Sequence, residues 1–126
     1  MSNFEQVHEF HKAFQCNIGN VPSLPNETER HIRKWLLKEE YEEYLEGEAN
    51  NDIVEIADGL VDMLYIIYGT GVSYGLPMDT LFDEVHLSNM SKLDNDGNPI
   101  FRADGKVLKG PNFFKPNIKN ILESCT

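Results

Sequence analysis

Apolar side chains recur every three or four residues along much of the chain, which is the spacing of one face of an α-helix. This pattern predicts four helices, near residues 3–15, 26–47, 53–68 and 79–92. Residues that commonly cap helices stand at the four expected starts, namely Ser2, Asn26, Asp52 and Asp79. We expect Gly69, Gly71, Gly75 and Pro77 to mark where the third helix frays and ends, because glycine is common at helix C-termini.

The chain changes character beyond the fourth predicted helix. Turn-forming residues crowd positions 94–99, and Asp104-Gly105 between two short apolar segments is a hairpin signal. One or two helical turns can follow over 117–123. The sequence therefore predicts an all-α fold of the four-helix-bundle type, with an irregular C-terminal tail that contains a short hairpin. We expect a single domain over residues 1–126, made of a bundle at about 3–93 and a tail at about 94–126.

Composition narrows the possible partners. The 126 residues are 40% hydrophobic, which is enough to bury the core of one domain. Twenty-one acidic against eleven basic residues give a formal charge of -10. That charge argues against a nucleic acid polymer or a membrane as partner, and it suits metal cations. Because the chain shows no signal peptide, no apolar membrane span and only two cysteines, we expect a soluble, cytoplasmic protein.

Ten acidic residues and no lysine or arginine lie between positions 39 and 62. Glu40 and Glu43 continue the apolar face that Ile32 and Leu36 begin on the second helix. Twelve of the sixteen residues over 53–68 are apolar or aromatic, and the three acids among them share one face: Glu55, Asp58 and Asp62. Carboxylates on faces that favour burial are costly unless they share a cation. Oxygen ligands favour Mg²⁺, with Mn²⁺ as a substitute, over zinc.

Two other interpretations of these acids compete with a magnesium site. A solvated acidic face is the ordinary role of a charge run, but it would not follow the apolar stripes of two helices. A di-iron carboxylate bundle needs Glu-x-x-His on two helices. That spacing has two counterparts, Glu5 with His8 and Asp83 with His86. The acid-rich helices carry no histidine, which disfavours di-iron, and His11 and His31 fit ordinary surface or packing positions.

The acidic positions also form two spaced motifs. Residues 39–43, Glu-Glu-Tyr-Glu-Glu, fit E-E-x-x-E, and Glu55 with Asp58 fits an E-x-x-D that begins twelve residues after Glu43. Together the motifs resemble the MazG-like, all-α nucleoside triphosphate pyrophosphohydrolases. That superfamily includes dimeric dUTPases and phosphoribosyl-ATP pyrophosphohydrolase. The phrase Asp-Met-Leu-Tyr that starts at Asp62 resembles the family's continuation of the third helix.

The resemblance implies roles for the individual acids. In the dUTPase-like branch the motif aspartate directly precedes the Leu-Leu-Tyr phrase, which makes Asp62 that aspartate and leaves Gly59 at the glutamate position. Both registers use one helix face, so both stay open. The implied metal ligands are Glu40, Glu43, Glu55, Asp58 and Asp62. The implied catalytic residues are Glu39, Glu40 and Glu43, with Glu39 as a metal ligand or a base that positions water.

The segment after the third helix adds candidate substrate contacts. Residues 84–92, together with Asp-Gly-Lys-x-x-Lys at 104–109, resemble the tail of the dUTPase-like branch. Lysines there suit phosphates, and an amide side chain offers both a donor and an acceptor to a base or sugar. The candidate substrate-binding residues are Asn89, Lys92, Lys106 and Lys109.

The resemblance implies a magnesium-dependent hydrolase that cleaves a nucleoside triphosphate between the α- and β-phosphates. The products are a nucleoside monophosphate and pyrophosphate, and the tail favours dUTP as substrate. Phosphoribosyl-ATP is the alternative substrate, and a non-enzymatic helical module that binds a metal or nucleotide is the alternative of another class. The third predicted helix is apolar on nearly every side, which suggests that a second copy of the chain covers it. The resemblance implies the same, so we expect a homodimer or a dimer of dimers.

Overall fold

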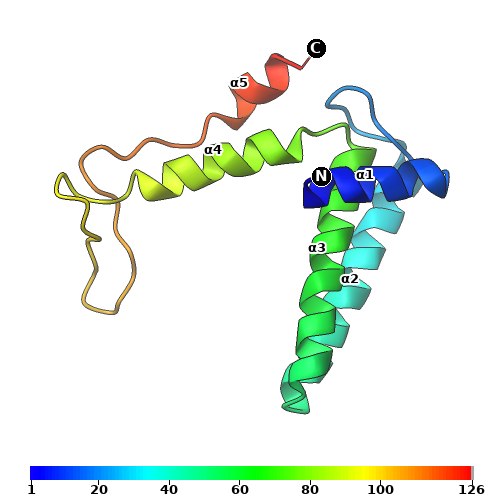
Figure 1. Ribbon diagram of the computed structural model, residues 1–126, viewed down its shortest axis with the longest axis horizontal. Helices are drawn as coiled ribbons and strands as arrows, with labels where there is room; N and C mark the ends of the chain where they lie inside the picture. The colour runs from blue at the N-terminus through cyan, green and yellow to red at the C-terminus, as the bar shows by residue number, and fades with distance from the viewer. Residues whose placement is uncertain (126) are drawn as a thin grey trace. The chain divides into compact units, whose positions relative to one another are not determined.

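The computed structural model describes residues 1–125, a range that contains five α-helices and no β-strand (Figure 1). The helices are α1 (Asn3–Ala13), α2 (Glu27–Ala49), α3 (Ile53–Ser73), α4 (Met78–Met90) and α5 (Ile118–Glu123). The predicted all-α class is therefore confirmed. Contacts divide the chain into two compact units, the first ending at Met78 and the second beginning at Asp79. A single domain, with its bundle extending to about residue 93, stays a prediction.

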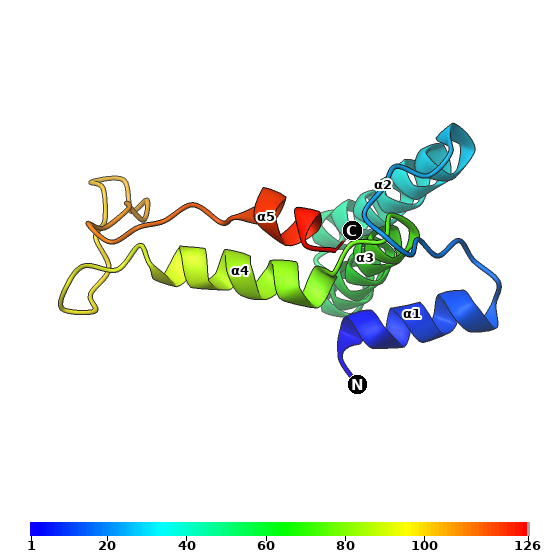
Figure 2. The ribbon, with the colours of Figure 1, turned by 90° about the horizontal axis from the view of Figure 1, so that it is seen from above.

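Helix α1 begins with a complete capping box. The Ser2 hydroxyl accepts the backbone N–H of Glu5 at 3.1 Å, and the Glu5 carboxylate accepts the backbone N–H of Ser2 at 3.0 Å. Each bond satisfies a donor that the first turn of a helix leaves without a partner. Helix α1 packs across α3 and buries Val7 to 2% exposure (Figure 2). It ends at Ala13, two residues before its predicted end.

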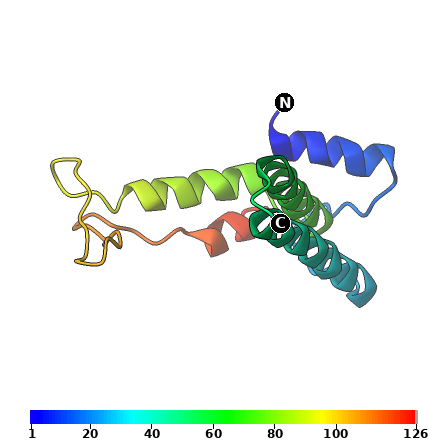
Figure 3. The same ribbon diagram turned by 90° about the horizontal axis from the view of Figure 1, so that it is seen from below.

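Helices α2 and α3 run antiparallel and side by side, joined by a short turn (Figures 1 and 3). Asn26 caps α2 by accepting the backbone N–H of Glu29 at 2.8 Å. Asp52 caps α3 by accepting the backbone N–H groups of Val54 and Glu55 at 3.1 and 3.2 Å. Both predicted caps are confirmed, and they fix where the two acid-bearing helices begin.

Glycines let α2 and α3 approach each other closely. A Cβ on Gly59 would lie 2.9 Å from the Cα of Tyr44, and a Cβ on Gly47 would lie 2.9 Å from the backbone nitrogen of Ile56. Neither position has room for a larger residue unless a helix moves, because both contacts are with backbone. The two helix backbones therefore touch at two points near the turn that joins them.

Helix α3 continues beyond its predicted end at residue 68 and reaches Ser73. Gly69 and Gly71 are buried inside the helix, so the prediction that they mark its end is wrong. Gly75 was also expected to mark the end, and it does so, since it follows the C-cap Tyr74 with a φ of +69°. A Cβ on Gly69 would clash with the guanidinium of Arg33, and a Cβ on Gly71 would clash with the side chain of Met78. These glycines make room for neighbouring side chains, and the helix continues through them.

The second unit contains most of α4, the tail and α5. Helix α4 begins at Met78, so Asp79 lies in its first turn, and the prediction that Asp79 precedes the helix as its cap is wrong. The tail returns along α4, where the Ser88 hydroxyl donates to the Phe114 carbonyl at 2.8 Å. Its predicted hairpin is confirmed by an antiparallel bridge between Phe101 and Val107. None of the described helices is both long and apolar enough to cross a membrane.

Candidate metal centre

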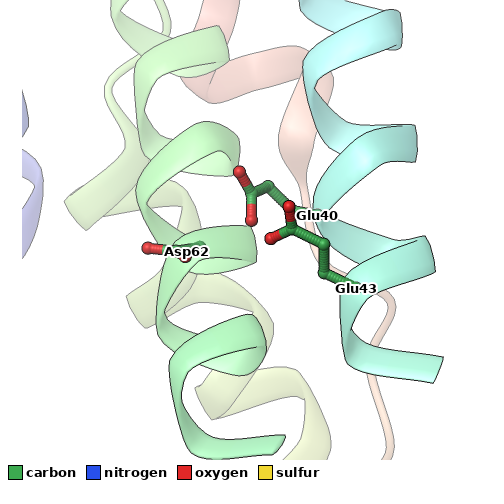
Figure 4. Close-up of side chains that lie close together, drawn as sticks. All are labelled: Glu40, Glu43 and Asp62. Carbon is green, nitrogen blue, oxygen red and sulfur yellow. The ribbon is translucent and has the colours of Figure 1, made fainter. Parts of the chain in front are cut away.

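Three carboxylates from α2 and α3 lie close together, and those of Glu40 and Glu43 reach from α2 toward α3, which carries Asp62 (Figure 4). Glu40 and Glu43 lie three residues apart on one face of α2, and Asp62 lies on α3. One oxygen atom from each side chain lies within 4.8 Å of the others. Acids that are spaced periodically along two separate helices thus form a single cluster when the helices pair.

The electrostatics of the cluster centre on Glu40. Glu40 and Asp62 are half-buried, whereas Glu43 is exposed. Burial, followed by the hydrogen bond and charge of Glu43 and then by Asp62, raises the pKa of Glu40 from its ordinary 4.5 to about 7. The Glu40 carboxylate is therefore about half protonated near neutral pH when no cation is bound.

The donor set fits a hard divalent cation. All three side chains offer carboxylate oxygens, which are the ligands that Mg²⁺ and Mn²⁺ prefer in proteins. The Oε2 atom of Glu40 is buried and has no hydrogen-bond partner, so a buried acceptor is left for a ligand. A cation at this place would offset both the repulsion among the acids and the burial of Glu40.

The other predicted acids lie outside this group of three. Glu39 and Asp58 are exposed, and Glu55 is half-buried in the first turn of α3, where its backbone N–H donates to the Asp52 cap. Of the two aspartates that share a face of α3, the structure brings Asp62 together with the glutamates of α2. Roles for Glu39, Glu55 and Asp58 stay predictions.

The candidate substrate residues all lie in the second unit. Asn89 is in the last turn of α4, and its carbonyl accepts the backbone N–H of Lys92 at 3.2 Å. The backbone N–H of Lys106 donates to the Asp104 carboxylate at 3.1 Å in the hairpin. The Lys109 ammonium lies over the ring of Phe113, 4.9 Å from its centroid. Their role in binding substrate stays a prediction.

Two polar residues are buried near the end of α3, and the sequence alone did not single out one of them, Arg33. Arg33 is 8% exposed and His11 is 3% exposed. The Nδ1 atom of His11 lies 2.8 Å from the carbonyl oxygen of Asn17, and burial lowers the pKa of the imidazole. His11 is thus a packing residue, one of the two roles expected for it. Arg33 could have been found as a cation seven residues before Glu40, on the same helix face.

Comparisons with known proteins identify the family of this chain. The sequence profile of the phosphoribosyl-ATP pyrophosphohydrolase family matches residues 7–89, a range that includes all three acids of the cluster. An uncharacterized protein of Acanthamoeba polyphaga mimivirus is 27% identical over 124 residues, or 95% of this chain. The chain spans 46% of that relative's length.

A solved structure also resembles the chain over nearly all of its length. It is the crystal structure of a proposed NTP pyrophosphohydrolase from Exiguobacterium sp. 255-15, with 26% sequence identity and a TM-score of 0.53. The similarity covers 99% of this chain and 94% of that one. The sequence profile and the solved structure therefore point to the same class of enzyme.

The raised pKa of Glu40 predicts how the stability of the metal-free protein depends on pH. Between pH 4.5 and about 7 the folded state keeps a proton that Glu40 has lost in the unfolded state. That bound proton stabilises the folded state, and its contribution is lost as the pH rises through about 7. In EDTA, raising the pH from about 5 to about 8 should lower the melting temperature of wild type more than that of Glu40→Gln.

The comparison of variants isolates Glu40, because buried His11 has a lowered pKa and contributes with the opposite sign. Glu42→Gln is the matched control. Glu42 is exposed, and its ion pair with Lys38, at 3.9 Å, is a surface pair that contributes little to stability. It should keep the wild-type pH dependence of the melting temperature. Equal pH dependence in wild type and Glu40→Gln would contradict the raised pKa.

Proposed function

The chain belongs to the phosphoribosyl-ATP pyrophosphohydrolase family, and we propose that it is a magnesium-dependent pyrophosphohydrolase of nucleoside triphosphates. The reaction cleaves between the α- and β-phosphates and releases a nucleoside monophosphate and pyrophosphate. The observation that carries this proposal is the cluster of three carboxylates, in which the buried Oε2 of Glu40 has no hydrogen-bond partner. The similarity to a proposed NTP pyrophosphohydrolase supports the same reaction class.

The acids divide the work between binding and proton transfer. Glu40, Glu43 and Asp62 would hold Mg²⁺ or its substitute Mn²⁺, with Glu55 and Asp58 as further ligands on the same face of α3. When bound, the metal supplies positive charge to the triphosphate and lowers the pKa of a coordinated water. Glu39 is exposed beside Glu40, and as a base it takes the proton of the attacking water.

Substrate binding would use both ends of the nucleotide. We assign the phosphates and the base or sugar to the four polar residues of α4 and the tail: Asn89, Lys92, Lys106 and Lys109. A cavity of about 350 Å³ between α1 and α3 is lined by Tyr65 and Tyr68. Tyr65 follows Asp62 by three residues, which is less than one helical turn. The aromatic side chains along this cavity suit the nucleoside part of such a substrate.

Two substrates deserve a direct comparison. The tail resemblance favours dUTP, whereas the family match over residues 7–89 favours phosphoribosyl-ATP. A screen of common nucleoside triphosphates and phosphoribosyl-ATP for pyrophosphate release, with Mg²⁺ and with Mn²⁺, distinguishes the two. Loss of release in EDTA separates the enzyme from a helical module that only binds nucleotides.

We also propose a homodimer or a dimer of dimers. Large apolar side chains are exposed along α3: Ile53, Val54, Leu60, Val61, Leu64 and Ile67. Exposed apolar patches of this kind mark association surfaces in soluble proteins. A second copy of the chain, which offers the same face by two-fold symmetry, is the partner that this surface suits.

Removing one carboxylate of the cluster tests the proposed metal centre. Glu43→Gln and Asp62→Asn should each lower kcat at least about a hundredfold, because groups that stabilise charge in a transition state contribute on that order. The folded state should survive, since each change relieves repulsion among like charges. Pyrophosphate release at saturating substrate and Mg²⁺ measures kcat, and circular dichroism reports the fold.

Glu46→Gln is the matched control for these two variants. Glu46 lies on α2, three residues beyond Glu43, but it is exposed and lies outside the cluster. Its kcat should stay within about twofold of wild type, because removing an exposed charge changes little. If Glu43→Gln and Asp62→Asn both kept more than about a tenth of wild-type kcat, the cluster would not be the active site.

A separate variant tests the tail. If the Lys109 ammonium binds a phosphate, Lys109→Ala removes a charge-assisted contact of roughly 1.5–3 kcal/mol, and kcat/KM falls about tenfold or more. The melting temperature should barely change, because a cation over an aromatic ring at the surface contributes little. Exposed Lys115→Ala is the control and should match wild type. Unchanged kcat/KM in Lys109→Ala would remove the tail from the active site.

A further inference from the structure

Arg33 of α2 is buried against the C-terminal half of α3. Its Nη2 donates to the backbone carbonyl of Ile66 at 2.9 Å, and its Nε donates to the Thr70 hydroxyl at 3.1 Å. The Thr70 hydroxyl in turn donates to the same Ile66 carbonyl at 2.9 Å. Burial lowers the pKa of Arg33, which is the sign of a cation held in an unfavourable environment. A buried cation is costly, so its retention calls for a specific role.

The position of Arg33 links it to the acid cluster. Arg33 precedes Glu40 by seven residues, or about two turns, and so lies on the same face of α2. Ile66 follows Asp62 by four residues, or about one turn of α3. In this antiparallel pair, Arg33 therefore joins the two helices on the same line of contact as Glu40 and Asp62.

The cluster is held from both ends of this line. Toward the turn, the backbone of α2 touches α3 at Gly59, where a Cβ would lie 2.9 Å from the Cα of Tyr44. Toward the other end, the two hydrogen bonds of Arg33 fasten the helices. Three carboxylates between these points repel one another, and a slide or rotation of α2 would relieve that repulsion.

Arg33 does not act as a counter-ion to the cluster. Among residues 1–125 the ion pairs are Lys38 with Glu42, Arg102 with Asp104 and Lys119 with Glu123, and none joins Arg33 to an acid of the cluster. Its side-chain bonds run to a backbone carbonyl and a hydroxyl of α3. The influence of Arg33 on the acids is therefore geometric.

We propose that Arg33 is a positioning residue whose two hydrogen bonds set the register of α2 against α3, and so the spacing of Glu40, Glu43 and Asp62. This inference rests on the proposed metal centre. It predicts that Arg33 controls metal affinity although it touches no ligand. Groups that orient metal ligands typically change affinity about 10- to 100-fold when they are removed.

Mn²⁺ binding to the full chain tests this role. Arg33→Met removes both hydrogen bonds while keeping an unbranched side chain, and the dissociation constant for Mn²⁺ should rise about tenfold or more. Electron paramagnetic resonance of free Mn²⁺ measures that constant, and circular dichroism confirms the folded fraction. Lys34→Met is the matched control, because Lys34 is the exposed cation next along α2. It should leave the constant within about twofold of wild type.

Two more conservative variants provide the test if Arg33→Met fails to fold. Thr70→Val removes the acceptor of the Nε bond, and Arg33→Lys keeps a donor for Ile66. Thr70→Val should weaken Mn²⁺ binding in the same direction, and Arg33→Lys should restore affinity to within about threefold of wild type. Pyrophosphate release by each variant is measured alongside.

The outcomes separate this inference from the proposed function. A folded Arg33→Met or Thr70→Val with a lowered melting temperature but wild-type Mn²⁺ affinity would mean a purely structural role and overturn the inference. A wild-type protein that binds Mn²⁺ through the cluster but releases no pyrophosphate would overturn the proposed function alone. A wild-type protein that binds no Mn²⁺ would overturn both.

Discussion

The close pairing of α2 with α3 is the constraint on which the rest of the first unit depends. It brings Glu40, Glu43 and Asp62 within 4.8 Å of one another, although like charges so close together repel. The pairing is possible because glycine at position 59 lets the α3 backbone approach Tyr44. The repulsion among these acids lowers the stability of the metal-free protein, which is the kind of local strain that is common at functional sites.

Among the three acids, the unfavourable electrostatic energy of that arrangement affects mainly Glu40. Its Oε2 is buried without a partner, and its pKa rises to about 7 because burial and two neighbouring acids oppose its charge. A bound divalent cation reverses both effects at once, since it favours the ionised carboxylate and provides the missing partner. The same feature that destabilises the metal-free protein at high pH therefore makes the metal-bound form favourable, which links stability, pH and the proposed chemistry.

Helical spacing was enough to predict the elements that carry the site, but not the contacts between them. The caps Asn26 and Asp52 and the acid stripes on α2 and α3 follow from local patterns. The choice between Asp58 and Asp62 needed the pairing of helices, because the two share a face of α3 and only packing decides which one meets α2.

The error at Gly69 and the failure to single out Arg33 have one physical origin, which is that long-range packing overrides local signals. Glycine commonly marks helix ends, so Gly69 indicated an end to α3. In the structure its missing Cβ makes room for the Arg33 guanidinium, and the helix continues to Ser73. Arg33 itself looks like a surface charge in the sequence, since nothing local shows that Ile66 and Thr70, more than thirty residues away, accept its hydrogen bonds.

The most direct test of the central claim is a crystal structure of the protein grown with Mn²⁺ and measured at a wavelength where manganese scatters anomalously. We expect an anomalous peak within bonding distance of carboxylate oxygens from Glu40, Glu43 and Asp62. A peak found only elsewhere, or no peak at saturating Mn²⁺, would contradict the account.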